Sequence, residues 1–330
     1  CNHGSLSRER DTASQYVTLC ANLVSGGLMG LCFLVGVPGN IAVIVFILHH
    51  FKKDNFTVHL MLNLAAADIL CLITLPVWIY SELESIDKVT CKFFTALVYC
   101  SAYSSVITVT VLSVYRCLRI RHPQLWSRMS KRRERALLIS GWSLALLFSC
   151  PGVLTQEIIQ SGSKMECERI LESKDSRIVA LLESLLGFFL PFTIMLTSYY
   201  CLYKTATQGA FRCRHRPTKL VTRIVIVFFI FWAPHQIIKL EEICAKFLGS
   251  EPVLSLVSDI AGSLIFINSC VNPFLYAFSS RSLHKRKQPK ESMVTKGSQH
   301  LQRDHSIAVN SSLVKPNTLH LTIMSSQHMQ

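Results

Sequence analysis

Two carboxylic acids lie inside long apolar stretches of this 330-residue chain. Asp68 ends the segment "LNLAAAD", and Glu183 lies in "LLESLLGFFLPF", eight residues before Pro191. An ionised carboxylate in apolar surroundings is costly unless a partner compensates it. Asp68 is therefore either a protonated, hydrogen-bonded structural acid or the centre of a cation site. Glu183 is either a buried, hydrogen-bonded carboxyl or a contact for a ligand. Neutral oxygens that would complete a cation site are carried by Ser105, Asn268, Ser269 and Asn272.

An arginine-rich segment, "LSVYRCLRIRHP", comes after another apolar run. Its first arginine, Arg116, stands 25 residues after Cys91, which corresponds to about 37 Å of helix. If Cys91 lies at one face of a membrane, Arg116 lies at the other, where a long cationic side chain either snorkels or turns inward. A simple charged anchor would explain a lone arginine, so the other motifs must decide its role.

The composition indicates a membrane protein. Half of the residues are hydrophobic (50%) and only 16% are charged, which is less charge than a soluble protein of this size keeps on its surface. Apolar stretches of about 20 residues can cross a hydrocarbon core of about 30 Å, and their backbone polar groups must be satisfied internally. The sequence predicts an all-α membrane protein, a seven-transmembrane helix bundle with spans at residues 19–48, 57–80, 91–115, 135–156, 178–203, 220–245 and 254–278.

The distribution of basic residues predicts the orientation. The segments after spans one, three, five and seven hold 24 of the 34 lysines and arginines. The positive-inside rule therefore places residues 1–18 outside the cell, the spans within a membrane domain at 19–287, and the tail at 288–330 in the cytoplasm. The tail is polar, and we expect it to be disordered. The net charge of +14 then faces anionic membrane lipid and cytosolic partners, not nucleic acid. The sequence shows no internal repeat of the kind expected in a transporter. It also shows no metal cluster or activated nucleophile of the kind expected in an enzyme.

Several short motifs occur together and in order. The chain contains Gly39-Asn40, "LAAAD" ending in Asp68, Cys91 and Cys167, Trp142, Pro191 with Tyr199, "FFIFWAP" around Trp232 and Pro234, and "NPFLY" from Asn272 to Tyr276. Together they resemble the rhodopsin-like (class A) G-protein-coupled receptors over residues from about 20 to 287. The topology also favours a disulfide between Cys91 and Cys167, because both lie on the oxidising side.

The resemblance implies a two-state signalling mechanism. Arg116 would turn inward to contact a heterotrimeric G protein and Tyr199, while Pro234 offers a hinge in the sixth span. The other activation residues would be Asn272, Pro273 and Tyr276. An allosteric sodium ion, with no other cofactor, would bind at Asp68, Ser105, Asn268, Ser269 and Asn272. Tyr115 replaces the family's usual acid beside the arginine, so we expect a weaker restraint and higher basal signalling.

Finer features are similar to the chemoattractant receptors and, within them, to the leukotriene B4 receptors. "ESLLGFFLPF" and "LVTRIVIVFFIFWAPHQIIKL" carry this similarity, which implies a lipid acid agonist, an inhibitory-type G protein, and roles in chemotaxis and the inflammatory response. We expect Lys239, or next Arg177, to anchor the acid, although either side chain alone could also snorkel. The remaining predicted ligand contacts are Tyr99, Tyr103, Glu183, Phe188, Trp232, His235, Gln236 and Phe266.

The tail and two alternatives complete the predictions. The segment "SSRSLHKRK" is typical of a short amphipathic eighth helix on the membrane surface. Phosphorylation by receptor kinases at Ser292, Thr295, Ser298, Ser306, Ser311 or Ser312 would recruit arrestin. Because the motif at Arg116 is altered, a scavenger receptor that does not couple to a G protein is one alternative. Because the outer segments are acidic, a receptor for a chemokine or other peptide agonist is the other.

Overall fold

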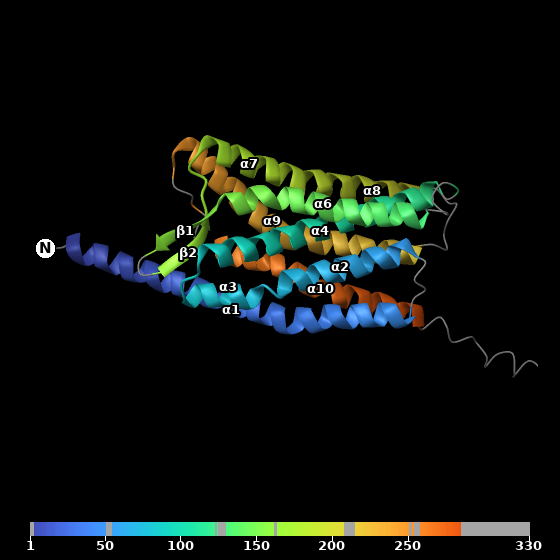
Figure 1. Cartoon of the computed structure of the whole chain (residues 1–330), viewed down its shortest axis with the longest axis horizontal. Helices are drawn as coiled ribbons and strands as arrows, with labels where there is room; N and C mark the ends of the chain where they lie inside the picture. The colour runs from blue at the N-terminus through green and yellow to red at the C-terminus, as the bar shows by residue number, and fades with distance from the viewer. Residues whose placement is uncertain are drawn as a thin grey trace, which may run out of the picture. The chain divides into compact units, whose positions relative to one another are not determined.

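The computed structural model describes residues 3–50, 55–122, 124, 130–161, 164–207, 215–250, 253 and 258–284, with backbone only for several of them at the ends of helices. The chain divides into two units, Cys1–Ser279 and Ser280–Gln330. The first unit holds almost every described element (Figure 1). In chain order the elements are α1 (His3–His50), α2 (Phe56–Leu72), α3 (Leu75–Leu83), α4 (Lys88–Arg121), α6 (Lys131–Leu154), β1 (Gln156–Ser161), β2 (Lys164–Arg169), α7 (Lys174–Ser184), the π-helical turn η1 (Leu185–Phe189), α8 (Leu190–Thr207), α9 (His215–Leu248) and α10 (Ser258–His284).

The helices coincide with the predicted spans. Among the described residues, five stretches are long and apolar enough to cross a membrane: Leu19–His50, Phe56–Leu83, Lys88–Arg121, Lys131–Leu154 and Lys174–Thr205. The sixth predicted span lies in α9, and the seventh lies in α10, which contains the shorter apolar stretch Ile260–Pro273.

Two predicted spans are interrupted instead of regular. The second breaks at Ile73 and Thr74, where the Thr74 hydroxyl donates to the Cys71 carbonyl at 2.7 Å and Pro76 begins the next helix without an N–H group. The fifth contains the π-turn η1 just before Pro191. Gly187 in this turn lies so close to the Tyr103 ring that a Cβ atom would stand 2.5 Å from its Cε1. The break in the second span therefore lies where Pro76 lacks an N–H donor. The π-turn in the fifth span lies where the Tyr103 ring packs against Gly187.

α4 lies at the centre of the helix packing. It contacts α2, α6, α8 and α9, and the first strand of the hairpin lies against it. Its Val106, Val109 and Leu112 are almost fully buried in the main apolar core, together with Met195 of α8 and Phe228 of α9. A polar relay reinforces this packing, because the Trp142 indole donates to Asn63 at 2.8 Å and Asn63 donates to Thr108 at 2.6 Å. These bonds join α6, α2 and α4.

A β-hairpin that the sequence did not predict lies beside the ends of α3 and α4 (Figure 1). Its strands pair antiparallel, and Cys167 of β2 forms the predicted disulfide with Cys91 of α4. Glu157 of β1 forms ion pairs with Lys88 at 2.6 Å and Lys92 at 3.3 Å. Hydrogen bonds from these two lysines lower the pKa of the Glu157 carboxyl. This contribution to stability is therefore present above the ordinary glutamate pKa and is lost as the pH falls through the depressed value.

The ends of the chain differ from the predicted boundaries. α1 begins at His3, so most of the predicted 1–18 segment is helical and continuous with the first span. α10 continues without a break to His284, through the first part of the predicted eighth helix. Residues 285–287 and the predicted tail, with its candidate phosphorylation sites, lie outside the described residues, so the eighth helix and the tail stay predictions.

A close approach of three helices makes Gly36 a sensitive position. A Cβ atom there would lie 2.6 Å from a methyl of Leu72 and 2.7 Å from the Cys270 sulfur. We expect Gly36→Val to cost about 1–3 kcal/mol by overpacking and to lower the thermal unfolding temperature of the solubilised protein. Gly27→Val on the same helix is the control, since nothing lies within 4 Å of its Cβ position. Equal melting temperatures for the two variants would contradict this packing.

Candidate functional site

A buried ion cluster lies beneath the hairpin. The Glu183 carboxylate, at the end of α7, contacts Arg169 of β2 at 2.7 Å and Lys239 of α9 at 3.1 Å. The three side chains are only 5%, 13% and 10% exposed, respectively. Three elements that are distant in sequence therefore bring two cations to one carboxylate, and a second acid, Glu242 of α9, lies within electrostatic range of both cations.

The hydrogen bonds of this cluster are incomplete. Among the described residues, the Nε and Nη2 groups of Arg169 and the Oε1 atom of Glu183 have no well-aligned partner. Burial alone would lower the pKa of the Arg169 guanidinium, but Tyr99 and Glu183 outweigh that effect and raise it. Arg169 therefore stays charged, with donors left over for another anion or hydroxyl group.

Several predicted ligand contacts surround this cluster. Tyr99 and Tyr103 of α4 lie within electrostatic range of both Arg169 and Glu183. His235 of α9 lies within range of Lys239 and Arg169. The next residue on α9, Gln236, is 6% exposed, and its side-chain oxygen lacks a hydrogen-bond partner in the described part of the chain.

Aromatic side chains lie on α9 and on the adjoining η1–α8 segment. Phe188, Phe192 and Phe229 form a stack in which the closest ring centroids are 4.3 Å apart. The Trp232 ring stacks on Phe228 at 5.2 Å, and its indole N–H has no partner among the described residues. The apolar part of the predicted site is therefore present as a packed aromatic cluster.

Two predicted ligand contacts lie elsewhere. Phe266 packs with Trp78 and Leu75 in a separate cluster between α1, α3 and α10. Arg177 donates a hydrogen bond to the Lys246 carbonyl near the end of α9, and its guanidinium lies 5.0 Å from the centre of the Phe247 ring. These contacts hold α7 to α9, so Arg177 has a structural role. Its positive charge also complements the C-terminal end of α9.

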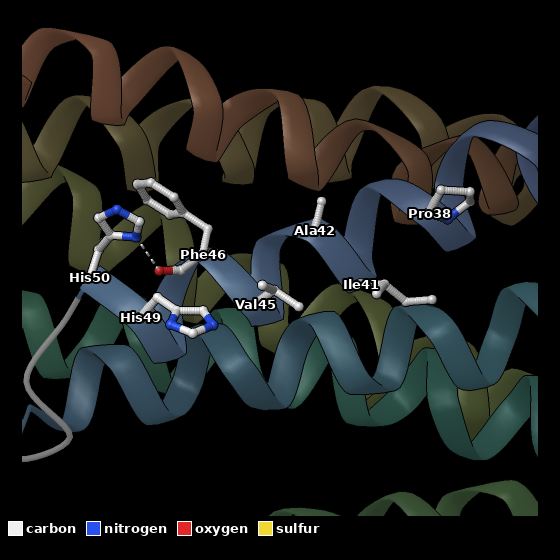
Figure 2. A pocket seen from close by; sticks show the side chains of 7 residues that line it. All are labelled: Pro38, Ile41, Ala42, Val45, Phe46, His49 and His50. Carbon is white, nitrogen blue, oxygen red and sulfur yellow. Dashed lines mark hydrogen bonds between the residues drawn. The ribbon is translucent and has the colours of Figure 1, made fainter.

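A groove of about 570 Å³ lies on α1, away from this cluster (Figure 2). Its lining runs along one helix and comprises Pro38, Ile41, Ala42, Val45, Phe46, His49 and His50. The His50 ring stacks on Phe46 and hydrogen-bonds to the Phe46 carbonyl at 3.1 Å. None of the predicted ligand contacts lines it.

The second predicted site, around Asp68, is fully buried. Asn272 donates to one carboxylate oxygen of Asp68 at 2.7 Å, and Ser105 donates to the other at 3.3 Å. Ser269 also contacts this carboxylate, while Asn268 is buried one residue earlier on α10. Among the described residues the Asn272 side-chain oxygen has no donor. An acid, hydroxyls and an unpaired carbonyl oxygen form an oxygen-only set, which fits a hard cation such as sodium.

Comparison with known proteins identifies the family. The family model for the 7 transmembrane receptor (rhodopsin family) matches residues 39–276. The chain belongs to the rhodopsin family of seven-transmembrane receptors. The type-1 angiotensin II receptors of Bos taurus and Ovis aries are each 31% identical to it over 284 residues. The Homo sapiens receptor of the same name is 30% identical over 284 residues, and that match covers 78% of this chain and 77% of the relative.

Membership confirms the predicted seven-transmembrane fold and the class of function. The receptor is a multi-pass membrane protein of the G-protein-coupled receptor class, and receptors of this family are signalling proteins instead of enzymes.

The other end of the receptor carries the predicted activation residues. Arg116 is half-buried on α4, and Tyr199 is 39% exposed on the neighbouring α8. Pro234 interrupts the hydrogen bonding of α9, and Pro273 of α10 packs against Gly39, whose Cβ position is 3.2 Å from its ring. Tyr276 lies in α10, and its side chain is outside the described residues.

Tyr115 has a packing role where the family usually places an acid. It is 7% exposed and makes an edge contact with Phe56 of α2, with ring centroids 5.0 Å apart. The Arg119 guanidinium lies 6.0 Å from the centre of the Tyr115 ring. Tyr115 thus joins α4 to α2 through its aromatic contact with Phe56, and its cation–π contact with Arg119 lies within α4, neither of which the sequence predicted.

Arg169 is the main site residue that the sequence did not reveal. It ends the short polar segment "KMECER", in whose sequence nothing distinguishes it from a surface arginine. The one available signal was its position two residues after Cys167, since a disulfide at Cys167 holds this segment against the outer end of α4.

A double-mutant cycle tests the ion cluster. We expect Glu183→Gln to destabilise the receptor by about 3 kcal/mol, because it leaves two buried cations without their counter-charge. Adding Lys239→Gln should restore part of that loss, since it removes the repulsion between Lys239 and Arg169. The measurement is thermal unfolding of the purified receptor without ligand. Strictly additive effects of the two substitutions would contradict the coupling.

Proposed function

We propose that this receptor binds an extracellular ligand through a carboxylate group held by Arg169 and Lys239, and that it signals through inhibitory-type G proteins. One observation carries the proposal. Two buried cations face a single glutamate, and the guanidinium keeps donors that the described chain does not fill. A ligand carboxylate would accept from the guanidinium donors that lack an aligned partner and would add a negative charge beside the two cations.

The first candidate ligand is a lipid acid of the leukotriene B4 type. The apolar side chains at Phe188, Phe192 and Trp232 would accept a hydrocarbon chain, and such ligands are bound mostly by apolar contacts with a few placed polar groups. Gln236, His235 and Tyr103 supply polar groups for hydroxyls along that chain. The similarity of "ESLLGFFLPF" to leukotriene B4 receptors supports the same choice.

The second candidate is a peptide with a free carboxyl terminus. The relatives named above are angiotensin II receptors, and angiotensin II is a peptide. A terminal carboxylate would meet the same two cations, and the hairpin would lie beside the rest of the peptide. Both candidates therefore share the carboxylate and differ in the group that carries it, a hydrocarbon chain in one and a peptide in the other.

The proposed orientation places the hairpin end outside the cell, in the plasma membrane. The disulfide Cys91–Cys167 supports this, because such bonds persist on the oxidising side of a membrane. Arg116, Arg119 and Arg121 lie about 37 Å or more further along α4 and would reach the cytoplasm.

The proposed signal passes along α9. Lys239 lies five residues after Pro234, and Trp232 lies two residues before it, so one helix carries the cation, the hinge and the aromatic contact. A ligand that draws Lys239 away from Glu183 changes the balance between two arrangements of α9. Movement of the inner half of α9 would then open a surface at Arg116 and Tyr199 for the G protein.

Charge-neutral ligand analogues test the binding site. We expect leukotriene B4 to bind and its methyl ester to bind at least about tenfold more weakly, and Arg169→Gln to abolish that difference. The same comparison between angiotensin II and its C-terminal amide tests the peptide candidate. The measurement is competition binding on membranes, with Arg177→Gln as the control that should keep the preference for the acid. Equal affinity for the acid and neutral forms of both ligands would refute the proposed carboxylate site.

Coupling is measured separately from binding. Ligand-stimulated nucleotide exchange on a purified inhibitory-type G protein distinguishes a signalling receptor from the alternative, a scavenger that binds without coupling. The proposal is supported if the ligand concentration that stimulates nucleotide exchange follows the affinity for the acid form. The proposal also includes a role in chemotaxis and the inflammatory response. Recruitment of arrestin after phosphorylation by receptor kinases belongs to the same proposal.

We also propose that sodium binds at Asp68 as an allosteric ion. The site is fully buried, its donors are all oxygens, and Asn272 contributes an oxygen that is unpaired in the described chain. An ion bound in one arrangement of the helices stabilises that arrangement.

The sodium proposal predicts a salt-specific stabilisation. Sodium chloride should raise the melting temperature of the receptor by several degrees above choline chloride at equal ionic strength. Asp68→Asn should remove this difference, because the ion loses its charged ligand, whereas Glu183→Gln should keep it. Equal melting temperatures of the unaltered receptor in the two salts would refute the site.

A further inference from the structure

Two free thiols meet at the inner end of the receptor. Cys117 of α4 is 8% exposed and Cys201 of α8 is half-buried, and their side chains face each other across the packed α4–α8 interface. They lie beside residues of the activation set, since Cys117 comes directly after Arg116 and Cys201 comes two residues after Tyr199.

A guanidinium is directed at this pair. The exposed Arg121, one helical turn after Cys117, donates a hydrogen bond from Nη1 to the Cys201 sulfur at 3.5 Å. A neighbouring cation stabilises the thiolate, which is the nucleophilic form of cysteine. Redox-sensitive cysteines combine this electropositive setting and partial exposure with a second thiol placed to react next.

The other free cysteines lack one or more of these features. Cys20, Cys150 and Cys244 are exposed, and Cys32, Cys71, Cys100 and Cys270 are buried. In the part of the chain that the structure describes, Cys201 is the cysteine for which an arginine hydrogen bond and a facing thiol coincide.

We propose that Cys117 and Cys201 form a peroxide-sensitive thiol pair, which closes to a disulfide that clamps α4 to α8. The compartment of the oxidant rests on the orientation proposed above, because a cytoplasmic peroxide must reach Cys201 from the inner face. The bond itself does not depend on the identity of the agonist.

The chemistry balances in two steps. The Cys201 thiolate attacks hydrogen peroxide, its O–O bond breaks, and the products are Cys201 sulfenic acid and hydroxide, which takes up a proton to give water. The Cys117 sulfur then attacks the sulfenic sulfur, the S–O bond breaks, and a second water leaves with the Cys117 proton. The two thiols together lose two electrons, and one peroxide gains them.

The disulfide would change signalling because of its position. A covalent link between α4 and α8 beside Arg116 and Tyr199 fixes the distance between two helices that form the proposed G-protein surface. It also leaves the Cys201 sulfur, which accepts from Arg121, unable to ionise. We therefore expect the oxidised receptor to show several-fold lower basal and agonist-stimulated nucleotide exchange.

Peptide mapping tests the bond directly. The full-length receptor in lipid nanodiscs is treated with hydrogen peroxide, free thiols are then blocked, and the digest is searched by mass spectrometry for a peptide linking Cys117 to Cys201. We expect this peptide after oxidation and not before, and slower formation in Arg121→Gln. Overoxidised Cys201 with no linked peptide would overturn the proposal.

A matched variant separates the clamp from general oxidative damage. Cys117→Ser keeps Cys201 and Arg121 but cannot close the bond, so its nucleotide exchange, relative to its own untreated sample, should not fall after peroxide. An equal fall in Cys117→Ser and the unaltered receptor would also overturn the proposal. Basal exchange needs no agonist, so this result is independent of the ligand assignment.

Sidedness is tested with a membrane-impermeant thiol reagent. Cys201 should be labelled in inside-out vesicles and protected in right-side-out vesicles. Labelling in right-side-out vesicles alone would refute the proposed orientation and the cytoplasmic oxidant, while the linked peptide would still report on the thiol pair itself.

Discussion

A polar group buried in a membrane must find its partners within the protein, because lipid tails offer none. This constraint explains how the receptor is organised. Asp68 is held by Ser105 and Asn272, and the Trp142 indole by Asn63. These bonds join α2 to α4, α6 and α10, so polar pairing also decides which helices lie together. The pairing is incomplete at the ion cluster and at Asn272, which are the two places where we propose that a ligand and an ion bind.

The ion cluster gains its significance from the elements that supply it. Glu183 comes from α7, Lys239 from α9, and Arg169 from a hairpin that a disulfide ties to α4. A ligand bound at the proposed site would contact the hairpin and α9 at the same time. The same α9 carries Trp232 and Pro234 toward the inner end. The proposed function therefore links ligand binding to a helix rearrangement through one continuous element, as a two-state receptor requires.

The inner end is restrained differently from the family's usual pattern. Tyr115 replaces an acid, and it packs against Phe56 and beneath Arg119 instead of supplying a carboxylate. Cys117 faces Cys201 across the same interface. Aromatic packing and a thiol contact thus lie where a purely electrostatic restraint is typical. Packing of this kind is insensitive to ionic strength, whereas the proposed thiol pair would respond to oxidants, so the two contacts would respond to different conditions.

The sequence by itself determined the spans, the disulfide and the buried acids. Hydrophobic length is a local property, and both Asp68 and Glu183 stand out because they interrupt apolar runs. The π-turn near Gly187 was not predictable, since the Tyr103 ring that lies against it comes from another helix. The break at Thr74 depends on local contacts, its hydroxyl bond to Cys71 and the adjacent Pro76, but a hydrophobic run of this length predicts one continuous span. Arg169 could not be distinguished from a surface arginine, and Phe266 and Arg177 looked like ligand contacts until their neighbours were known. Only the tertiary structure decided these points, because the charge and packing around a side chain come from segments far away in sequence.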